Sequence, residues 1–461
     1  MTATATTSWS SASSSESQRV FCGCRVSVST VGSSLRVFRD PEFLAMSGTA
    51  FARAQAYSTV AIALALYAGI FDVSSTVEGL FGTAFALVQL IIVLPLGRAI
   101  DTGNAKRWLL FGLGLNVAVF FGFMAISNVA GVIVMRVFQG VAASILWLTG
   151  STVIGEISGE DEQGLWLGTY NQVGAFSSLF GDLVGGAILA VFGFTAAYSV
   201  LAGVTLGAGV LVYAVLRDNP GGKKDAEEAT GRETLESLLS LPTVRALVGF
   251  RFGLSFGKMA VITFLPIYAH TEFGMNPFVV GGLLAGGKLT KALTQGYVGN
   301  LTDQWGNKHL FIATGAMLYA AGALLIPLAG FARGVVPSVT LTLPDVANAP
   351  TGGIDLPPAF FVLSGAYMVC GIADSIRLPA SMAMFVEEGE KFDAVGGAFS
   401  LRSVAWKVGQ VIGPVTVGYV WDAASVGFAF GLAATLIVAA TAVFLVVYET
   451  TSPSPEPTVG D

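Results

Sequence analysis

Long apolar runs separated by short polar segments recur along almost the whole of this 461-residue chain. A helix needs about 20 predominantly apolar residues to cross the hydrocarbon core of a bilayer. Stretches of that length predict an all-α membrane protein. Its twelve transmembrane helices are expected near 43–71, 79–100, 108–126, 130–154, 165–192, 196–216, 244–268, 278–301, 310–329, 359–385, 394–420 and 426–448.

The polar segments divide these spans into two groups of six. The longest hydrophilic segment, 217–243, follows the sixth span and is predicted to be a cytoplasmic linker. It separates an N-terminal six-helix bundle at 41–216 from a C-terminal six-helix bundle at 244–448. Residues 1–40, rich in Ser and Thr, are expected to form a disordered cytoplasmic tail, and 449–461 a C-terminal tail.

The distribution of basic residues predicts the orientation of the chain. With the N-terminus inside, thirteen of the 24 Lys and Arg residues fall in cytoplasmic segments and ten in the spans. Only Arg333 falls outside, in the Pro- and Gly-rich loop 330–358, which is expected to be irregular. The positive-inside rule then predicts a multi-pass plasma-membrane protein with both termini cytoplasmic.

The composition excludes a soluble protein of this size, because 53% of the residues are hydrophobic and only 12% are charged. The net charge of −6 lies largely in acidic loops, so no nucleic-acid partner is expected. Cys22 and Cys24 are close together but have no histidine nearby, so neither a metal site nor a cofactor is expected. The bilayer itself and a small-molecule solute are the expected partners.

The two halves resemble each other in sequence. PEFLAMSG (41–48) leads into the first span as PTVRALVG (242–249) leads into the seventh, and GVAASI (140–145) in the fourth span recurs as GIADSI (371–376) in the tenth. Internal duplication is typical of transporters that bind substrate between two repeats. We therefore expect two pseudo-symmetric bundles.

Four motifs carry a family resemblance. The loop after the second span reads GRAIDTGNAKR (97–107), and its counterpart after the eighth reads GNLTDQWGNKH (299–309). The fourth span contains RVFQG (136–140), and the fifth contains the glycine-rich GAFSSLFGDLVGG (174–186). Over roughly residues 39–450 the chain resembles the major facilitator superfamily. The resemblance implies that family's fold, alternating access and, from the fifth-span glycines, an antiporter.

The resemblance also implies conformational roles in the two loops. Asp101 is expected to latch onto the start of the eleventh span when the protein is open to the outside, where a helix N-terminus favours a carboxylate. Lys106 and Glu156 would form the accompanying charge relay. The full set of residues with expected gating roles is Gly97, Asp101, Lys106, Glu156, Gly299, Asp303, Gly306 and Lys308.

Basic residues inside the spans suggest the class of substrate. Lys258, Lys288, Lys291 and Lys407 fall near span midpoints, where four charges facing lipid would cost about 10 kcal/mol together. They must meet water, counter-ions or a ligand. One interpretation is a cavity for an anionic solute, with candidate ligands Arg136, Lys258, Lys288, Lys291, Arg377 and Lys407. The alternative is that some lysines are buried neutral, some reach the surface and some pair with Asp182.

The acids in the spans are few. Asp374 and Arg377 lie three residues apart on one helix face and are expected to pair. Asp182 and Asp374 are the candidate coupling residues, while exchange of one anion for another needs no protonatable carboxylate. An enzyme would need a nucleophile, base or metal constellation, which the sequence lacks. The remaining alternative is a proton-coupled, multidrug-type exporter of lipophilic compounds.

Overall fold

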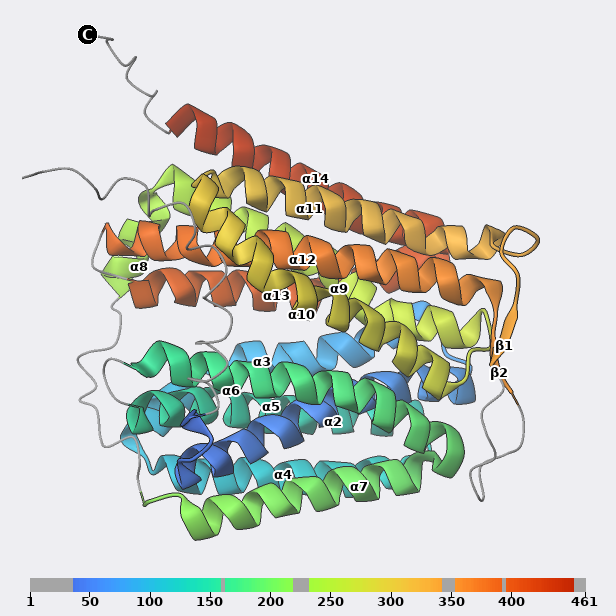
Figure 1. Cartoon of the computed structure of the whole chain (residues 1–461), viewed down its shortest axis with the longest axis horizontal. Coiled ribbons are helices and arrows are strands. Elements are labelled where there is room, and N and C mark those ends of the chain that lie inside the picture. Colours follow the sequence, from blue (N-terminus) through green and yellow to red (C-terminus); the bar gives the residue numbers. More distant parts are fainter. Residues whose placement is uncertain (1–35, 159–161, 219–231, 342–352, 392–394, 452–461) are drawn as a thin grey trace, which may run out of the picture.

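The computed structural model describes residues 36–158, 162–218, 232–341, 353–391 and 395–451 (Figure 1). Within these ranges, long helices form two bundles that lie side by side. The first bundle contains α2 (Pro41–Phe71), α3 (Ser75–Thr102), α4 (Ala105–Met124), α5 (Val129–Ile157), α6 (Gln163–Phe180) and α7 (Gly186–Val215). The second contains α9 (Pro242–Thr271), α10 (Pro277–Trp305), α11 (Lys308–Leu325), α12 (Pro358–Glu390), α13 (Val395–Ala423) and α14 (Val426–Thr451). The expected all-α membrane fold with twelve spans is confirmed.

The helices begin where short polar side chains can cap them. The side chains of Asn104, Asn128 and Asn276 accept hydrogen bonds from backbone N–H groups in the first turns of α4, α5 and α10. Such a cap satisfies a donor that has no partner within the helix. Pro277 follows Asn276 at the first position of α10, where its missing N–H costs nothing. These caps fix where α4, α5 and α10 begin.

The fifth span is irregular in its middle. A π-helical turn, η2 (Gly181–Gly185), joins α6 to the start of α7. The chain then reverses at Gly193, whose φ of 75° is accessible to glycine at little cost, and the rest of α7 forms the sixth span. Single π-helical turns occur frequently at functional sites.

One segment differs from the sequence prediction, and another contains a helix that the prediction did not specify. The loop 330–358 is not wholly irregular, because β1 (Val339–Leu341) and β2 (Ile354–Leu356) pair as antiparallel strands. Each strand is only three residues long, with one polar residue between two apolar ones. A pattern this short does not distinguish a strand from a loop. The linker 217–243 contains a helix, α8 (Arg232–Ser240). Of the predicted tails, residues 1–35 and 452–461 lie outside the described residues.

The two ends of the molecule can be named by these segments. The linker end carries α8, and the hairpin end carries β1 and β2 (Figure 1). The bundles meet closely at the hairpin end. A Cβ added at Gly79 would lie 2.4 Å from the Pro414 carbonyl oxygen, and one at Gly418 would lie 2.1 Å from the Ser75 carbonyl oxygen. These glycines allow the backbones of α3 and α13 to touch.

Within the described residues, nine helical stretches are long and apolar enough to cross a membrane, and one of them, Leu165–Val215, contains two spans. The two long helices outside this set are α10 and α13. Helix α10 carries Lys288 and Lys291, and helix α13 carries Arg402 and Lys407. The least apolar spans therefore lie next to the bundle interface, where α13 packs on α3 and α10 packs on η2.

Candidate functional site

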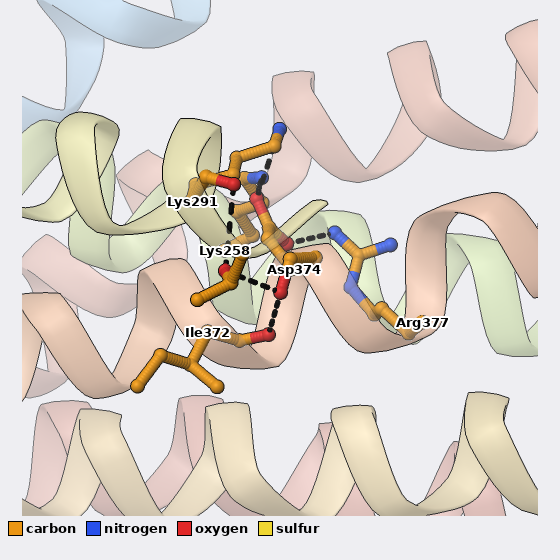
Figure 2. Close-up of polar contacts among 7 residues, drawn as sticks. Lys258, Lys291, Ile372, Asp374 and Arg377 are labelled. Atoms are coloured by element: carbon orange, nitrogen blue, oxygen red, sulfur yellow. Dashed lines mark hydrogen bonds and ion pairs between the residues drawn. The ribbon is translucent and has the colours of Figure 1, made fainter. Parts of the chain in front are cut away.

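Three cations from three helices converge on Asp374 (Figure 2). Lys258 of α9 and Arg377 of α12 bind its two carboxylate oxygens, and the Lys291 ammonium of α10 lies 3.6 Å from Oδ2. The Asp374 side chain is 7% exposed and that of Arg377 is 1% exposed. We call these four residues the Asp374 cluster. The expected pair between Asp374 and Arg377 is present, and two predicted lysines join it.

The Asp374 cluster carries more positive than negative charge. With all four side chains ionised, three cations share one carboxylate, which leaves a net charge of +2. The Nε and Nη1 atoms of Arg377 have no hydrogen-bond partner within the described residues. Trp406 lies beside the cluster, with its ring centroid 5.9 Å from the Lys258 ammonium. Such a cluster has donors left over for an anionic group.

Lys288 belongs to a different arrangement, which joins the two bundles. Its ammonium lies 2.6 Å from Oδ2 of Asp182 in η2 and donates to the hydroxyls of Ser58 and Ser178 at 2.8 Å each. The Asp182 side chain is fully buried. Asp182 was predicted as a coupling residue and Lys288 as a substrate ligand. They are each other's partners across the interface, and we call them the inter-bundle pair.

Lys407 of α13 also reaches the first bundle. Its ammonium donates to the side-chain oxygen of Gln89 in α3, and the side-chain oxygen of Gln410 lies 3.2 Å away. Among the described residues no carboxylate pairs with it, so its charge is solvated by amides alone. No local sequence pattern points to Gln89 as its partner, because the contact joins residues far apart in the chain.

Arg136 of α5 has its described partners within the first bundle. Its Nε donates to the Phe81 carbonyl oxygen at 2.9 Å, and its Nη1 donates to Oε1 of Gln139 at 2.6 Å. The guanidinium also lies 4.3 Å from the centroid of the Phe85 ring. Arg136 is buried, so its side chain does not extend to the outer surface. Its described hydrogen bonds join none of the central lysines.

Lys106, from the predicted charge relay, and Lys308, its counterpart in the second half, have different partners. In the first half, Lys106 donates to the Leu216 carbonyl oxygen at 2.6 Å and lies 3.3 Å from Asp218, beyond the end of α7. The relay with Glu156 stays a prediction. In the second half, Lys308 forms an ion pair with Glu387 of α12.

Glu387 was missed, although the repeat contains a signal for it. It follows GIADSI by as many residues as Glu156 follows GVAASI. Carrying Glu156 through the repeat would therefore have placed a carboxylate opposite Lys308.

The remaining loop residues are only partly described. Gly306 ends α10 with φ of 68°, which explains the glycine in the second loop. A Cβ at Gly97 would meet nothing within 4 Å, so close packing does not require this glycine. The side chains of Asp101 and Asp303 lie outside the described residues, and so do the surroundings of Gly299.

A further contact between the bundles was not predicted. Asp422, near the end of α13, caps the N-terminus of α3: its Oδ1 accepts from the Ser75 N–H, and its Oδ2 from the Thr76 N–H, both at 2.8 Å. Oδ2 also accepts from the Thr76 hydroxyl at 2.5 Å. Partial burial raises the pKa of Asp422, but these hydrogen bonds outweigh burial and hold it below its ordinary value. Asp422 is therefore an ionised cap across the interface.

Comparisons with known proteins agree with this architecture. The family model of the Major Facilitator Superfamily matches residues 46–342 and 247–460. An uncharacterized MFS-type transporter of Methanocaldococcus jannaschii is 20% identical over 79% of this chain and 86% of its own length. The multidrug resistance protein MdtG of Dickeya zeae is 22% identical over 79% of this chain and 82% of its own. The crystal structure of the nucleoside transporter NupG superposes with a TM-score of 0.67 at 12% identity, covering 88% of this chain and 99% of that one.

Proposed function

Because the chain belongs to the major facilitator superfamily and is thus a multi-pass secondary active transporter rather than an enzyme, we propose that it moves a small anionic solute bound at the Asp374 cluster. The observation that carries this proposal is the sharing of one carboxylate among three cations. An anionic group of the solute would bind Lys258, Lys291 or the free donors of Arg377 and compete with Asp374. Desolvation inside the protein strengthens such contacts.

We further propose that the linker end faces the cytoplasm. The basic residues near that end, such as Lys106, Arg217 and Lys308, greatly outnumber those at the hairpin end, where Arg333 lies. Both termini are then cytoplasmic. In the described residues, the polar contacts and close glycine approaches between bundles run from the helix midpoints to the hairpin end. The structure is then closed to the outside and open to the inside.

Alternating access follows from rearranging these contacts. We propose that residues 41–216 and 244–448 move as two bodies. Opening the hairpin end separates the inter-bundle pair, Asp182 and Lys288, as well as Lys407 from Gln89. The Asp374 cluster lies wholly within the second bundle and survives the movement. Substrate binding and bundle separation thus use different ion pairs, which suits exchange of one anion for another as an antiporter.

The test is counterflow in liposomes that contain the purified protein. A panel of labelled organic and inorganic anions is compared with lipophilic cations. Lys291→Gln removes the most exposed cation of the Asp374 cluster and is expected to lower anion counterflow at least tenfold, while Lys291→Arg retains most of it. Lys391→Gln, which alters a lysine paired with Glu388 outside the cluster, is the matched control and should leave counterflow unchanged.

One relative supports a second candidate, a proton-coupled exporter of lipophilic compounds. The chain is similar over most of its length to a protein named for multidrug resistance. In the same panel, this function predicts counterflow of lipophilic cations that is indifferent to Lys291→Gln. That result would refute the anion proposal and assign the Asp374 cluster a structural role.

A further inference from the structure

A cavity of about 640 Å³ lies between the bundles at the hairpin end. The first bundle lines it with the end of α2 and the start of α3, including Asp72 and Glu78. The second bundle contributes the end of α9 with His270 and Glu272, together with Trp421 of α13. The proposed anion site at the Asp374 cluster shares none of these residues.

The cavity is strongly acidic. Asp72, Glu78 and Glu272 line it, and the carboxylates of both Asp422 and Glu272 repel that of Glu78. The ring of His270 is the other titratable group on the wall, and its Nδ1 is already 2.8 Å from the Met275 carbonyl oxygen. Within the described residues, no lysine or arginine lines the cavity.

Glu78 is the residue that most requires a ligand. It is 5% exposed, lines the cavity, and forms no hydrogen bond or ion pair through its side chain with any described residue. Asp422 cannot help, because its two oxygens already cap Ser75 and Thr76. A buried carboxylate among other carboxylates is costly unless it takes up a proton or pairs with a cation.

The lining of the cavity suits a small cation with one positive charge. No three His, Cys, Asp or Glu residues in the described part of the chain are arranged to hold a metal ion, so a cation bound here would not have a full shell of protein ligands. The cavity is also large enough for a cation that keeps part of its water. A sodium ion and a proton share the required chemistry.

We propose that this cavity binds a monovalent cation, with Glu78 as its central ligand, when the bundles close at the hairpin end. Glu78 comes from the first bundle and Glu272 from the second, so the site is complete only in the closed arrangement. Without a cation, closure brings like charges together. The bound cation therefore favours the structure described here and biases the equilibrium towards the closed hairpin end.

The test uses the full-length protein in nanodiscs of uncharged lipid. Thermal unfolding is measured while N-methyl-D-glucamine chloride is replaced by NaCl at constant ionic strength, at pH 6 and at pH 8. Wild type is expected to gain roughly 2 °C at a Na⁺ concentration ten times the Kd. Glu78→Gln, which removes the charge but keeps the shape, should unfold at least as high and lose the response. Asp355→Asn, an acid exposed on β2, is the control and should keep it.

A proton as the occupant gives a different pattern. The structure described here would then bind more protons than the unfolded chain, so the stability of wild type falls as pH rises from 6 to 8. Na⁺ would have no effect, and Glu78→Gln would be less sensitive to pH than Asp355→Asn. If Glu78→Gln matches wild type in both its Na⁺ and its pH response, the cavity is not a cation site. Neither result affects the test of the proposed function, because that test measures anion counterflow in the Lys291→Gln variant.

Discussion

Asp182 and Asp374 hold the central cations in different ways. Asp182 faces one ammonium, that of Lys288, and this pair is electrically balanced. Asp374 faces three cations and leaves a surplus of positive charge. The surplus suits anion binding, whereas the balanced pair suits a contact that forms and breaks between bundles.

The inter-bundle pair predicts an asymmetric response to neutralisation. Lys288→Gln leaves the fully buried Asp182 without its counter-ion, and we expect thermal unfolding to show a loss of about 3 kcal/mol. Asp182→Asn should cost less, because Lys288 is 29% exposed and keeps the hydroxyls of Ser58 and Ser178. The double variant should recover at least about 1 kcal/mol relative to Lys288→Gln alone. The measurement is a double-mutant cycle by thermal unfolding in detergent.

A second cycle serves as the control for these charges. Lys391→Gln and Glu388→Gln alter a lysine–glutamate pair in which the lysine is 59% exposed. We expect less than about 1 kcal/mol of coupling there. Equal coupling in both cycles would mean that burial across the bundle interface adds nothing to the Asp182–Lys288 contact.

At the scale of helices, glycines set how closely α3 and α13 approach. Gly418→Ala places a methyl group 2.1 Å from the Ser75 carbonyl oxygen, which α13 can relieve only by moving away from α3. We expect this variant to open the hairpin end. The measurement is cross-linking of Gly69→Cys to His270→Cys with a short thiol reagent, since a Cβ at Gly69 would lie 3.5 Å from the His270 ring. The native cysteines are replaced by serine, and cross-linking should fall several-fold.

The control for this helix contact is Gly431→Ala in α14, where an added Cβ meets nothing within 4 Å. Cross-linking at the hairpin end should stay at the level of the parent. If Gly418→Ala and Gly431→Ala give equal yields, the approach of α3 to α13 does not control closure.

The sequence predicted where the helices lie better than it predicted which side chains of different helices contact one another. Apolar length located the spans, and the i, i+3 spacing of Asp374 and Arg377 predicted their pairing, because both signals are local. The glycines of the fifth span pack closely against α2, since a Cβ at Gly181 would lie 2.7 Å from the Gln55 carbonyl oxygen, but the antiporter that they implied stays a prediction. The convergence of Lys258 and Lys291 on Asp374, and the cap by Asp422, depend on how separate helices pack. Nothing local in a single sequence specifies that.

At the scale of the whole molecule, the contacts between bundles bias the equilibrium between two open states. The Asp422 cap, the Lys407–Gln89 contact and the inter-bundle pair all form when the hairpin end is closed. A transporter must also leave this state, so each contact can contribute only a small part of the difference in free energy. Removing one of these contacts should measurably change the populations of the two open states without unfolding the protein.

Asp422→Asn tests this idea, because it removes the charge that caps α3. An N-cap and a charge near a helix N-terminus are each worth about 1 kcal/mol, so the closed hairpin end should become roughly fivefold less favoured. Ala292→Cys reports the change: Ala292 is exposed one helical turn beyond Lys288 towards the linker end. With the native cysteines replaced, thiol labelling there should slow in Asp422→Asn. Asp355→Asn makes the same chemical change on β2, where the side chain contacts only Thr340 among described hydrogen bonds, and should label like the parent. Equal rates in the two variants would show that Asp422 caps α3 without biasing the transport cycle.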